Sequence, residues 1–394
     1  MILSFFTLCL FTTSLDPKCY APVKLPDPIE NMTLSYVQVM TRHGMRTPIE
    51  ILPNDRDQRG IWNCNPPNHL ASRTSTSPSL HYRLVHHRVD ERMIAYPPTC
   101  GNGDLTVEGM MMHYNIGSLY RSYLVDKLGF LPKKFDPRYF RFISSPVDRC
   151  FRSAESFIYG LYEPEDPNEV ITIQTGSAAV SSLVVPGENC QEAIDYTNEF
   201  RHGPIYEEYM NKTYPILKDA LNFFKLPKTY EGYDQLCSWV ISFTCNEDPQ
   251  TRVPSIINDT IIDQCYRVNA FNQYGMFSHA KSPGLFVSTA YRQAMKIADQ
   301  AIANSNGQKF ALLSAHDTTV AAYMTLLGKP DDKRPPPYAS HLAMEIWRDD
   351  SGERYVRYIF NGDPVPLAGF DNQTLVRFDN FRHYIAPFAD YCKK

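Results

Sequence analysis

The sequence predicts an α/β fold, with a mixed central sheet, helices on both faces and a smaller, mostly α-helical domain inserted. Three segments support it, because each is an apolar run of strand length, then a polar turn, then residues with helical spacing. Alternating runs at residues 341–347 and 355–360 flank Asp-Asp-Ser-Gly and predict a β-hairpin. The chain has 394 residues, 43% of them hydrophobic, which is enough for one large domain or two interleaved ones.

The individual elements follow in chain order. Residues 34–40 are the first predicted strand, and Thr106 is expected to cap a helix that runs to about residue 126. Further strands are predicted at residues 140–143, 170–174 and 310–313, and further helices up to residue 161 and at 287–304 and 320–327.

Four parts organise the chain. Residues 1–14 are expected to be a signal peptide, because their apolar run is too short to span a bilayer and small residues follow it. The α/β core takes residues 15–185 and 280–394, and residues 186–279 form the α-helical cap domain. Residues 54–99 are rich in Pro, Asn, Arg and His and lack periodicity, so we expect an insertion over the mouth of the site, or a solvated loop.

The most informative motif is Val-Gln-Val-Met-Thr-Arg-His-Gly-Met-Arg-Thr-Pro at residues 37–48. It places His43 between Arg42 and Arg46. Two guanidinium groups can hold phosphate oxygens by bidentate hydrogen bonds, so the imidazole between them is positioned to attack phosphorus. A lone histidine would more often be structural, but the flanking arginines favour the catalytic interpretation.

Two further segments place polar residues directly after predicted strands. The stretch Leu-Leu-Ser-Ala-His-Asp-Thr-Thr supplies His316 and Asp317, and Phe-Arg-Phe-Ile-Ser-Ser-Pro-Val-Asp-Arg ends in Arg149. Ligands of open α/β sheets bind beyond the carboxyl ends of strands, where helix N-termini favour anions. These residues can therefore converge with the first motif. The alternatives are a helix cap for Asp317 and a surface ion pair for Arg149, with Arg152 a weaker candidate for phosphate binding.

These motifs resemble the histidine acid phosphatases. Arg-His-Gly-x-Arg-x-Pro at residues 42–48 is that family's signature, and the His-Asp pair, the arginine after a strand and Gly-Asp-Leu-Thr-Val-Glu-Gly at 103–109 match it as well. The resemblance covers about residues 36–392. It implies two-step hydrolysis of phosphomonoesters through a phosphohistidine. The implied catalytic residues are His43, His316 and Asp317, and the implied phosphate ligands are Arg42, Arg46, Arg149 and His316.

The implied chemistry uses no cofactor and no metal, because three guanidinium groups supply the positive charge. Asp317 must be protonated to donate to the leaving alcohol, so an acidic optimum is expected. The histidines at positions 81, 86 and 87 suggest a metal site, but no carboxylate or cysteine stands at ligand spacing beside them.

Several functions remain alternatives to a secreted or lumenal acid phosphatase. One is a phytase or a sugar-phosphate phosphatase of narrow specificity, since the insertion faintly resembles xylose-phosphate phosphatases. Another is a noncatalytic glycoprotein that binds phosphorylated ligands, although such a protein would normally lose a catalytic residue. A net charge of −4 gives no reason to expect nucleic acid as a partner. The expected partner is a small phosphomonoester, and a homodimer is one assembly that the sequence allows.

Cysteine usage and sequons indicate export. Apart from Cys9 in the predicted signal peptide, nine dispersed cysteines contain no Cys-x-x-Cys pair, which favours disulfides in an oxidising compartment over zinc. The family resemblance suggests Cys190 with Cys392, and Cys64 with Cys100 is expected to close the insertion. The pairing of Cys150, Cys237, Cys245 and Cys265 is open, because Ser340 stands where many relatives carry the partner of Cys245. The sequons are at Asn31, Asn211, Asn258 and Asn372.

The expected location is therefore secreted or the lysosomal or vacuolar lumen. No membrane anchor is expected, because no later stretch reaches transmembrane length.

Overall fold

A computed structural model describes residues 19–54, 60–65, 99–164, 171–177, 181–185, 190–248, 250–303, 307–331 and 333–392. The predicted signal peptide, most of the insertion and the histidines at positions 81, 86 and 87 lie outside these residues.

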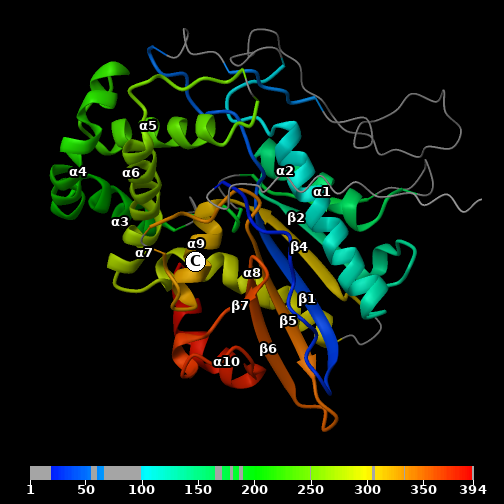
Figure 1. Ribbon diagram of the computed structural model, residues 1–394. Helices are drawn as coiled ribbons and strands as arrows, with labels where there is room; N and C mark the ends of the chain where they lie inside the picture. The colour runs from blue at the N-terminus through cyan, green and yellow to red at the C-terminus, as the bar shows by residue number, and fades with distance from the viewer. Residues whose placement is uncertain are drawn as a thin grey trace, which may run out of the picture.

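The described residues form a mixed sheet of eight strands in the order β3-β2-β4-β1-β5-β6-β7, with β8 paired to β6 (Figure 1). The pairs among β1, β2, β3 and β4 are parallel, and the pairs that involve β5 to β8 are antiparallel. The bounds are β1 (Thr33–Arg42), β2 (Phe140–Ser144), β3 (Ile173–Gln174), β4 (Phe310–Ala315), β5 (His341–Arg348), β6 (Arg354–Phe360), β7 (Asp363–Pro364) and β8 (Val376–Arg377). The predicted hairpin is the β5–β6 pair.

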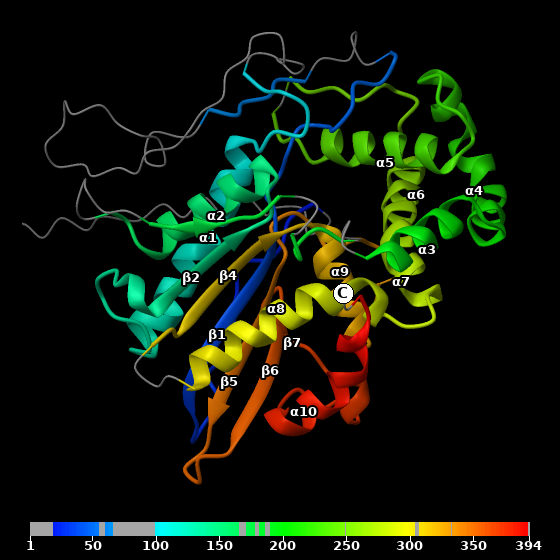
Figure 2. The same ribbon diagram turned by 180° about the vertical axis from the view of Figure 1, so that it is seen from behind.

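Helices cover both faces of the sheet, as predicted. Successive side chains of a strand point to opposite faces, so Val37 and Val39 of β1 pack in one core cluster and Tyr36 and Met40 in another. The first cluster includes side chains of α1 (Val107–Arg121) and α2 (Asp148–Leu161). The second includes those of α8 (Gly284–Ala303), α9 (Asp317–Leu326) and α10 (Phe378–Ile385). Figure 2 shows α8 lying across the sheet.

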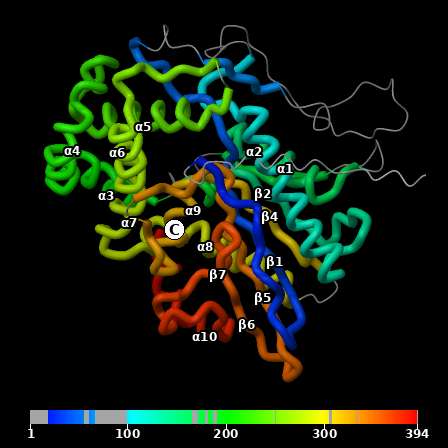
Figure 3. Tube along the Cα trace, viewed as in Figure 1, coloured from blue at the N-terminus to red at the C-terminus, as the bar shows by residue number. Residues whose placement is uncertain are grey.

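The described elements between residues 190 and 279 are helices, as the lack of strand alternation predicted. They are α3 (Gln191–His202), α4 (Pro204–Phe223), α5 (Tyr230–Thr244), α6 (Asp259–Ala270), η5 (Phe271–Gly275) and α7 (Met276–His279). Figure 3 shows α3 to α6 grouped to one side of the sheet. Their division from the core as a separate domain stays a prediction of the sequence. The other short helices are η3 (Ser122–Lys127), η4 (Pro137–Tyr139), η6 (Ala368–Phe370) and η7 (Ala386–Asp390).

Several predicted elements differ from the observed ones. Of the strand predicted at residues 170–174, the described residues form only β3 (Ile173–Gln174), and the helix predicted from residue 287 begins at Gly284. The helix after Thr106 ends as an α-helix at Arg121 and continues to Lys127 with wider, π-type turns. The helix after β4 begins at Asp317 rather than near residue 320, so the His-Asp pair lies at the helix start itself. That position puts the N-terminus of α9 at the residues of the predicted site.

Disulfides join parts of the chain that are far apart in sequence. The pairs are Cys19–Cys245, Cys64–Cys100, Cys190–Cys392 and Cys237–Cys265, and of the described cysteines Cys150 is free. Cys245 therefore pairs with Cys19, because the position where many relatives carry its partner is Ser340. The bond ties the N-terminal segment to the end of α5. The four asparagines of the predicted sequons are exposed.

Candidate active site

The carboxyl ends of β1, β2 and β4 meet at one edge of the sheet. Just beyond β1, His43 donates its backbone N–H to the carbonyl of Ala315 at 3.1 Å. Ser145, which follows β2, donates its backbone N–H to Ser314 at 2.9 Å. These bonds continue the parallel ladders past the strand ends, so the three predicted motifs lie side by side.

Helix α1 packs directly against the first motif. Thr106 caps the helix by accepting a hydrogen bond from the N–H of Gly109 at 3.2 Å. The backbones of Gly44 and Gly109 touch, and a Cβ atom on either would clash with backbone of the opposite segment. This close approach explains why both the Arg-His-Gly motif and the Gly-x-Leu-Thr-x-x-Gly stretch need their glycines.

His43 is a buried, neutral imidazole with a free nitrogen lone pair. The residue is 2% exposed, and its Nδ1 lies 2.8 Å from the carbonyl oxygen of Gly44. A carbonyl can only accept, so Nδ1 carries the proton and Nε2 is unprotonated. Burial lowers the pKa of His43 well below its usual value, and repulsion by Arg149, Arg42 and Arg46 lowers it further.

Arg42 joins the first motif to the second. Its Nη2 lies 3.1 Å from Oδ2 of Asp317, and its guanidinium carbon lies 4.2 Å from the ring centre of Tyr338. Its Nη1 also donates to the carbonyl of Pro336 at 2.5 Å. The buried His113 of α1 holds the backbone carbonyl of Arg42 through Nε2 at 3.1 Å. Three contacts therefore hold this guanidinium, and a fourth holds its backbone, before any ligand arrives.

Arg46 is held in place from the helical segment. Its Nη1 donates to Ser242 at 3.2 Å and its Nη2 to Ser238 at 3.2 Å, and both serines stand on α5. The remaining Nη1 contact is the carbonyl of Thr47 at 2.9 Å. The helical segment thus supplies part of the wall that orients a predicted phosphate ligand.

Arg149 stands close to the other guanidinium groups. It is half-buried, and its Nε has no hydrogen-bond partner among the described residues. Burial lowers its pKa, and repulsion by Arg46 and Arg42 adds to that effect. A buried N–H without a partner, in a group of like charges, is what an anion would satisfy.

His316 and Asp317 complete the group. The His316 ring lies 5.9 Å from that of His43, and its Nε2 lies 2.9 Å from Oγ of Ser145. Burial and the charge of Arg149 lower the pKa of His316 to about 3. Burial raises the pKa of Asp317, but attraction by Arg42, Arg46 and His316 and the hydrogen bond from the N–H of Thr318 together outweigh it, and the net pKa is lowered. Asp317 is therefore ionised beside three cationic side chains.

Arg152 does not belong to this group. Its Nη2 donates to the backbone carbonyl of Cys64 at 2.7 Å, next to the Cys64–Cys100 disulfide. Arg152, the weaker candidate for phosphate binding, thus binds the backbone where the insertion begins. The described residues contain no group of three or more His, Cys, Asp or Glu side chains that could hold a metal ion.

Several supporting residues were missed by the sequence analysis. Ser145 lay inside a quoted motif and could have been found from its position just after a strand. Ser238 and Ser242 stand four residues apart on α5 and so share one face, but nothing local links that face to Arg46. Tyr338 gave no signal in the sequence, because its role depends on a loop that packs over Arg42.

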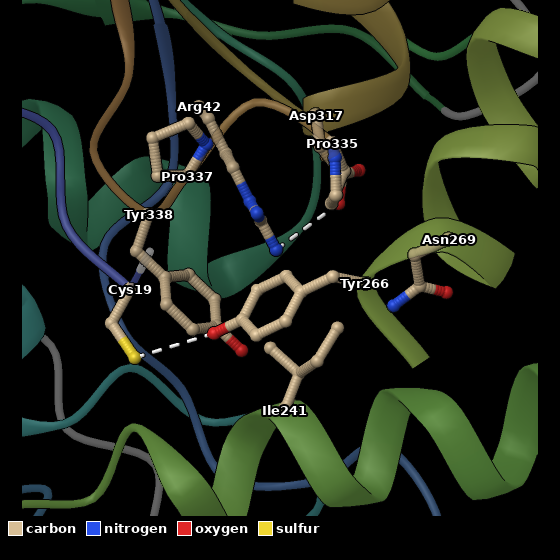
Figure 4. A pocket seen from close by; sticks show the side chains of 9 residues that line it. All are labelled: Cys19, Arg42, Ile241, Tyr266, Asn269, Asp317, Pro335, Pro337 and Tyr338. Atoms are coloured by element: carbon tan, nitrogen blue, oxygen red, sulfur yellow. Dashed lines mark hydrogen bonds and ion pairs between the residues drawn. The ribbon is translucent and has the colours of Figure 1, made fainter. Parts of the chain in front are cut away.

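A pocket opens beside the Arg42–Asp317 pair (Figure 4). Tyr266 and Ile241 reach it from α6 and α5, and Tyr338 also lines it. The pocket therefore adjoins the candidate site, because Arg42 and Asp317 belong to both.

Comparisons with known proteins identify the family of the chain. The family model described as histidine phosphatase superfamily (branch 2) matches residues 33–361. The chain is 23% identical to Counting factor 60 of Dictyostelium discoideum, over 100% of this chain and 97% of that protein. It is 25% identical to lysosomal acid phosphatase of Xenopus laevis, over 86% and 73% of the two chains.

Solved structures share the fold. The phytase of Hafnia alvei in complex with tartrate superposes with a TM-score of 0.61 at 15% identity, over 93% of this chain and 99% of that chain. Because the family model spans most of the chain and includes the strand ends described above, the protein belongs to the histidine phosphatase superfamily, branch 2.

Proposed function

We propose that this protein is an acid phosphatase that hydrolyses phosphomonoesters through a phosphohistidine on His43. One observation carries the proposal, namely that the Nδ1–H of His43 is bound to Gly44, which leaves the Nε2 lone pair free among three guanidinium groups. A neutral imidazole is a nucleophile, and the arginines around it attract the phosphate.

In the first step, Nε2 of His43 attacks phosphorus in line and the bond to the leaving oxygen breaks. Arg42, Arg46 and Arg149 bind the equatorial oxygens, where charge is spread in the transition state. His316 adds a ring nitrogen to the phosphate site. The centre of its ring lies 5.9 Å from the centre of the His43 ring. The positive charge is already in place, so little reorganisation is needed during the reaction.

Asp317 then has two roles in sequence. As a carboxylic acid it donates its proton to the leaving alkoxide. As a carboxylate it accepts a proton from the water that attacks the phosphohistidine. The ion pair between Asp317 and Arg42, a proposed phosphate ligand, supports this role, because a phosphate held by Arg42 would bring the leaving oxygen close to the carboxyl group. An acidic optimum follows, since the first step requires the protonated form.

The chain retains His43, His316 and Asp317, which argues against a noncatalytic glycoprotein. The partner is a small phosphomonoester, and a homodimer stays a prediction of the sequence. Four disulfides suit an oxidising compartment, so we place the protein outside the cell or in the lysosomal or vacuolar lumen. Within the described part of the chain, no helix is long and apolar enough to cross a membrane.

The test is direct. Purified protein is assayed at pH 4 to 8 with a nonspecific aryl phosphate, and the enzyme is quenched during turnover and analysed for phosphate bound to histidine. We expect acid-favoured turnover and a phosphohistidine at His43. Turnover without label on any histidine would reject the covalent mechanism, and no turnover would reject the enzyme.

A further inference from the structure

Arg42 meets the loop of residues 336–340 at three points. Its backbone N–H donates to the carbonyl of Ser340 at 2.8 Å, and its Nη1 donates to that of Pro336 at 2.5 Å. The ring of Tyr338 lies 4.2 Å from its guanidinium carbon (Figure 4). The loop therefore holds both the backbone and the charged group of Arg42.

Tyr338 also reaches Arg46, the second arginine assigned to phosphate. Its hydroxyl lies 3.3 Å from Oγ of Ser242, and Nη1 of Arg46 donates to the same oxygen at 3.2 Å. Ser242 gives its only hydroxyl proton to the carbonyl of Ser238 at 2.9 Å, so Tyr338 is the donor to Ser242. One tyrosine thus touches one guanidinium with its ring and is linked to the other through its hydroxyl.

The loop needs support from outside, because its backbone is strained. Ala339 has a φ of +56°, in the left-handed region that residues with a Cβ atom rarely adopt. Such a conformation persists only where surrounding contacts determine it. Its N–H donates to the carbonyl of His43 at 3.1 Å, so the strained residue itself lies on the first motif.

Residues 19–21 supply that support from the N-terminal side. The N–H of Tyr338 donates to the carbonyl of Cys19 at 3.0 Å, and the carbonyl of Tyr338 accepts from the N–H of Ala21 at 3.0 Å. These two bonds form a parallel bridge. The backbone of Tyr338 is therefore held on both sides of its Cα atom.

A disulfide and a hydrogen bond fasten residues 19–21 to the end of α5. Cys19 is bonded to Cys245, and the hydroxyl of Tyr20 donates to the backbone carbonyl of Cys245. These three residues are at most 4% exposed. Cys245 caps α5, the helix that carries Ser242, so the backbone and the hydroxyl of Tyr338 are both tied to one helix.

We propose that Tyr338 is a positioning residue for Arg42 and Arg46, and that residues 19–21, locked by their disulfide to α5, hold it against them. The two guanidinium groups repel each other, so contacts of this kind keep them at the spacing that a phosphate requires. The proposal rests on the proposed phosphatase function. It gives the N-terminal segment a part in phosphate binding through residues that are not themselves phosphate ligands.

The experiment measures the Kd of inorganic phosphate by calorimetry, kcat/KM for an aryl phosphate, and the melting temperature. Tyr338→Leu removes the ring from Arg42 and should weaken phosphate binding about tenfold, the scale of a desolvated cation–π contact. Tyr338→Phe keeps the ring and loses only the hydroxyl, so its loss should be about threefold. A wild-type Kd in Tyr338→Leu would overturn the proposal.

The matched control is Tyr162→Phe. Tyr162 is a buried tyrosine whose hydroxyl donates to the carbonyl of Pro132 at 2.5 Å and whose ring lies 5.0 Å from the guanidinium carbon of Arg121. Its substitution should lower the melting temperature and leave the Kd of phosphate unchanged. An equal loss of phosphate affinity in Tyr162→Phe and Tyr338→Phe would assign Tyr338 to general stability and contradict positioning.

A double-mutant cycle tests the link to Arg46. If the hydroxyl of Tyr338 acts through Ser242, the variant with both Tyr338→Phe and Ser242→Ala should bind phosphate no more weakly than Ser242→Ala alone. Additive losses would show that the two side chains act separately, and the assignment of Tyr338 to Arg46 would be rejected.

The disulfide is tested with two pairs of substitutions. Cys19→Ala with Cys245→Ala frees residues 19–21, whereas Cys237→Ala with Cys265→Ala removes a disulfide that joins α5 to α6 without touching the loop. Both should lower the melting temperature. Only the first should weaken phosphate binding, by about fivefold, the scale of one lost hydrogen bond. Equal effects of the two pairs on the Kd would overturn the role of residues 19–21.

Failure of this proposal is distinct from failure of the proposed function. A wild-type protein that does not hydrolyse the aryl phosphate would reject the phosphatase, whereas the positioning role is read from phosphate binding, which requires no turnover. If the variant without the Cys19–Cys245 disulfide does not fold, Tyr338→Phe still decides, because it leaves that disulfide and both backbone bonds of Tyr338 in place.

Discussion

Arg42 and Asp317 form an ion pair of 3.1 Å between Nη2 and Oδ2, although Arg42 is the last residue of β1 and Asp317 the first residue of α9. One partner is assigned to the phosphate and the other to the leaving oxygen. In the free protein the guanidinium keeps the carboxyl ionised, whereas catalysis requires it protonated. A bound phosphate competes for Arg42 and adds negative charge near Asp317. Binding of the substrate should therefore raise the pKa of the proton donor.

This relationship predicts two different pH profiles. Arg42 and Arg46 lower the pKa of Asp317 in the free enzyme, so the protonated form is lost there at low pH. In the complex the pKa is higher, and the protonated form persists to higher pH. The falling limb of kcat, which reports the complex, should lie at higher pH than that of kcat/KM, which reports the free enzyme.

The measurement is a set of initial rates across pH 3 to 8, with kcat/KM corrected for the ionisation of the ester. Coincident limbs would show that phosphate binding leaves the environment of Asp317 unchanged.

Replacing Asp317 separates proton donation from structure. Asp317→Asn should slow alkyl phosphates far more than activated aryl phosphates, because an alkoxide needs a proton in order to leave and a stable phenoxide does not. The substituted side chain can still accept the N–H of Thr318, which lies 2.9 Å from Oδ1. Equal losses on both kinds of ester would assign Asp317 a purely structural role at the start of α9.

His43 should be indispensable for turnover. His43→Ala is expected to retain less than about a hundredth of wild-type kcat, the scale for loss of a covalent nucleophile. The imidazole is 2% exposed, so truncation also leaves a cavity, and His43→Asn provides a variant of closer volume. Both are checked by circular dichroism and by rapid-quench labelling. A folded His43→Asn protein that still forms phosphohistidine would move the nucleophile elsewhere.

Arg149 is expected to lower the stability of the free protein and to strengthen the binding of phosphate. It stands beside Arg46 and Arg42, and its Nε has no partner in the described part of the chain. Arg149→Met removes this repulsion, so the free energy of unfolding should rise by about 1 kcal/mol, typical of a relieved functional site. The inhibition constant of inorganic phosphate should weaken by about tenfold or more, because a charge-assisted contact is lost.

Arg152→Met is the matched control, and its effect on stability should have the opposite sign. It removes the bond to the carbonyl of Cys64 and should lower the melting temperature, while leaving phosphate inhibition unchanged. Thermal denaturation with and without phosphate measures both effects. A lower melting temperature for Arg149→Met would contradict repulsion among the guanidinium groups.

Runs of apolar residues in the sequence predicted where the strands end. The positions of the strand ends then predicted which residues form the candidate site. Arg42, His316 and Arg149 each follow a buried run of apolar residues, and parallel strands bring such ends together. Contacts made by irregular segments could not be predicted in this way. The stacking of Tyr338 on Arg42 and the pairing of Cys19 with Cys245 depend on segments with no periodicity, whose approach is fixed by the finished fold.

Cys150 lies against His316 and should not react with thiol reagents in the native protein. Its Sγ lies 3.7 Å from both ring nitrogens of His316 and 3.1 Å from the carbonyl of Ala315, which accepts its proton. Burial raises its pKa to about 11, although the charge of Arg149 opposes the shift. The thiol is fully buried, and a thiolate is the reactive form.

Native protein beginning after the predicted signal peptide should therefore release no thiol to an aromatic disulfide reagent at pH 8, and one thiol per chain in denaturant. The native labelling rate should follow the global opening of the fold, because Cys150 stands on α2 and is buried against β4. Cys150→Ala is the control and should show no thiol under either condition. Rapid labelling of the native protein would mean that the space around His316 opens locally, and phosphate should then slow the reaction.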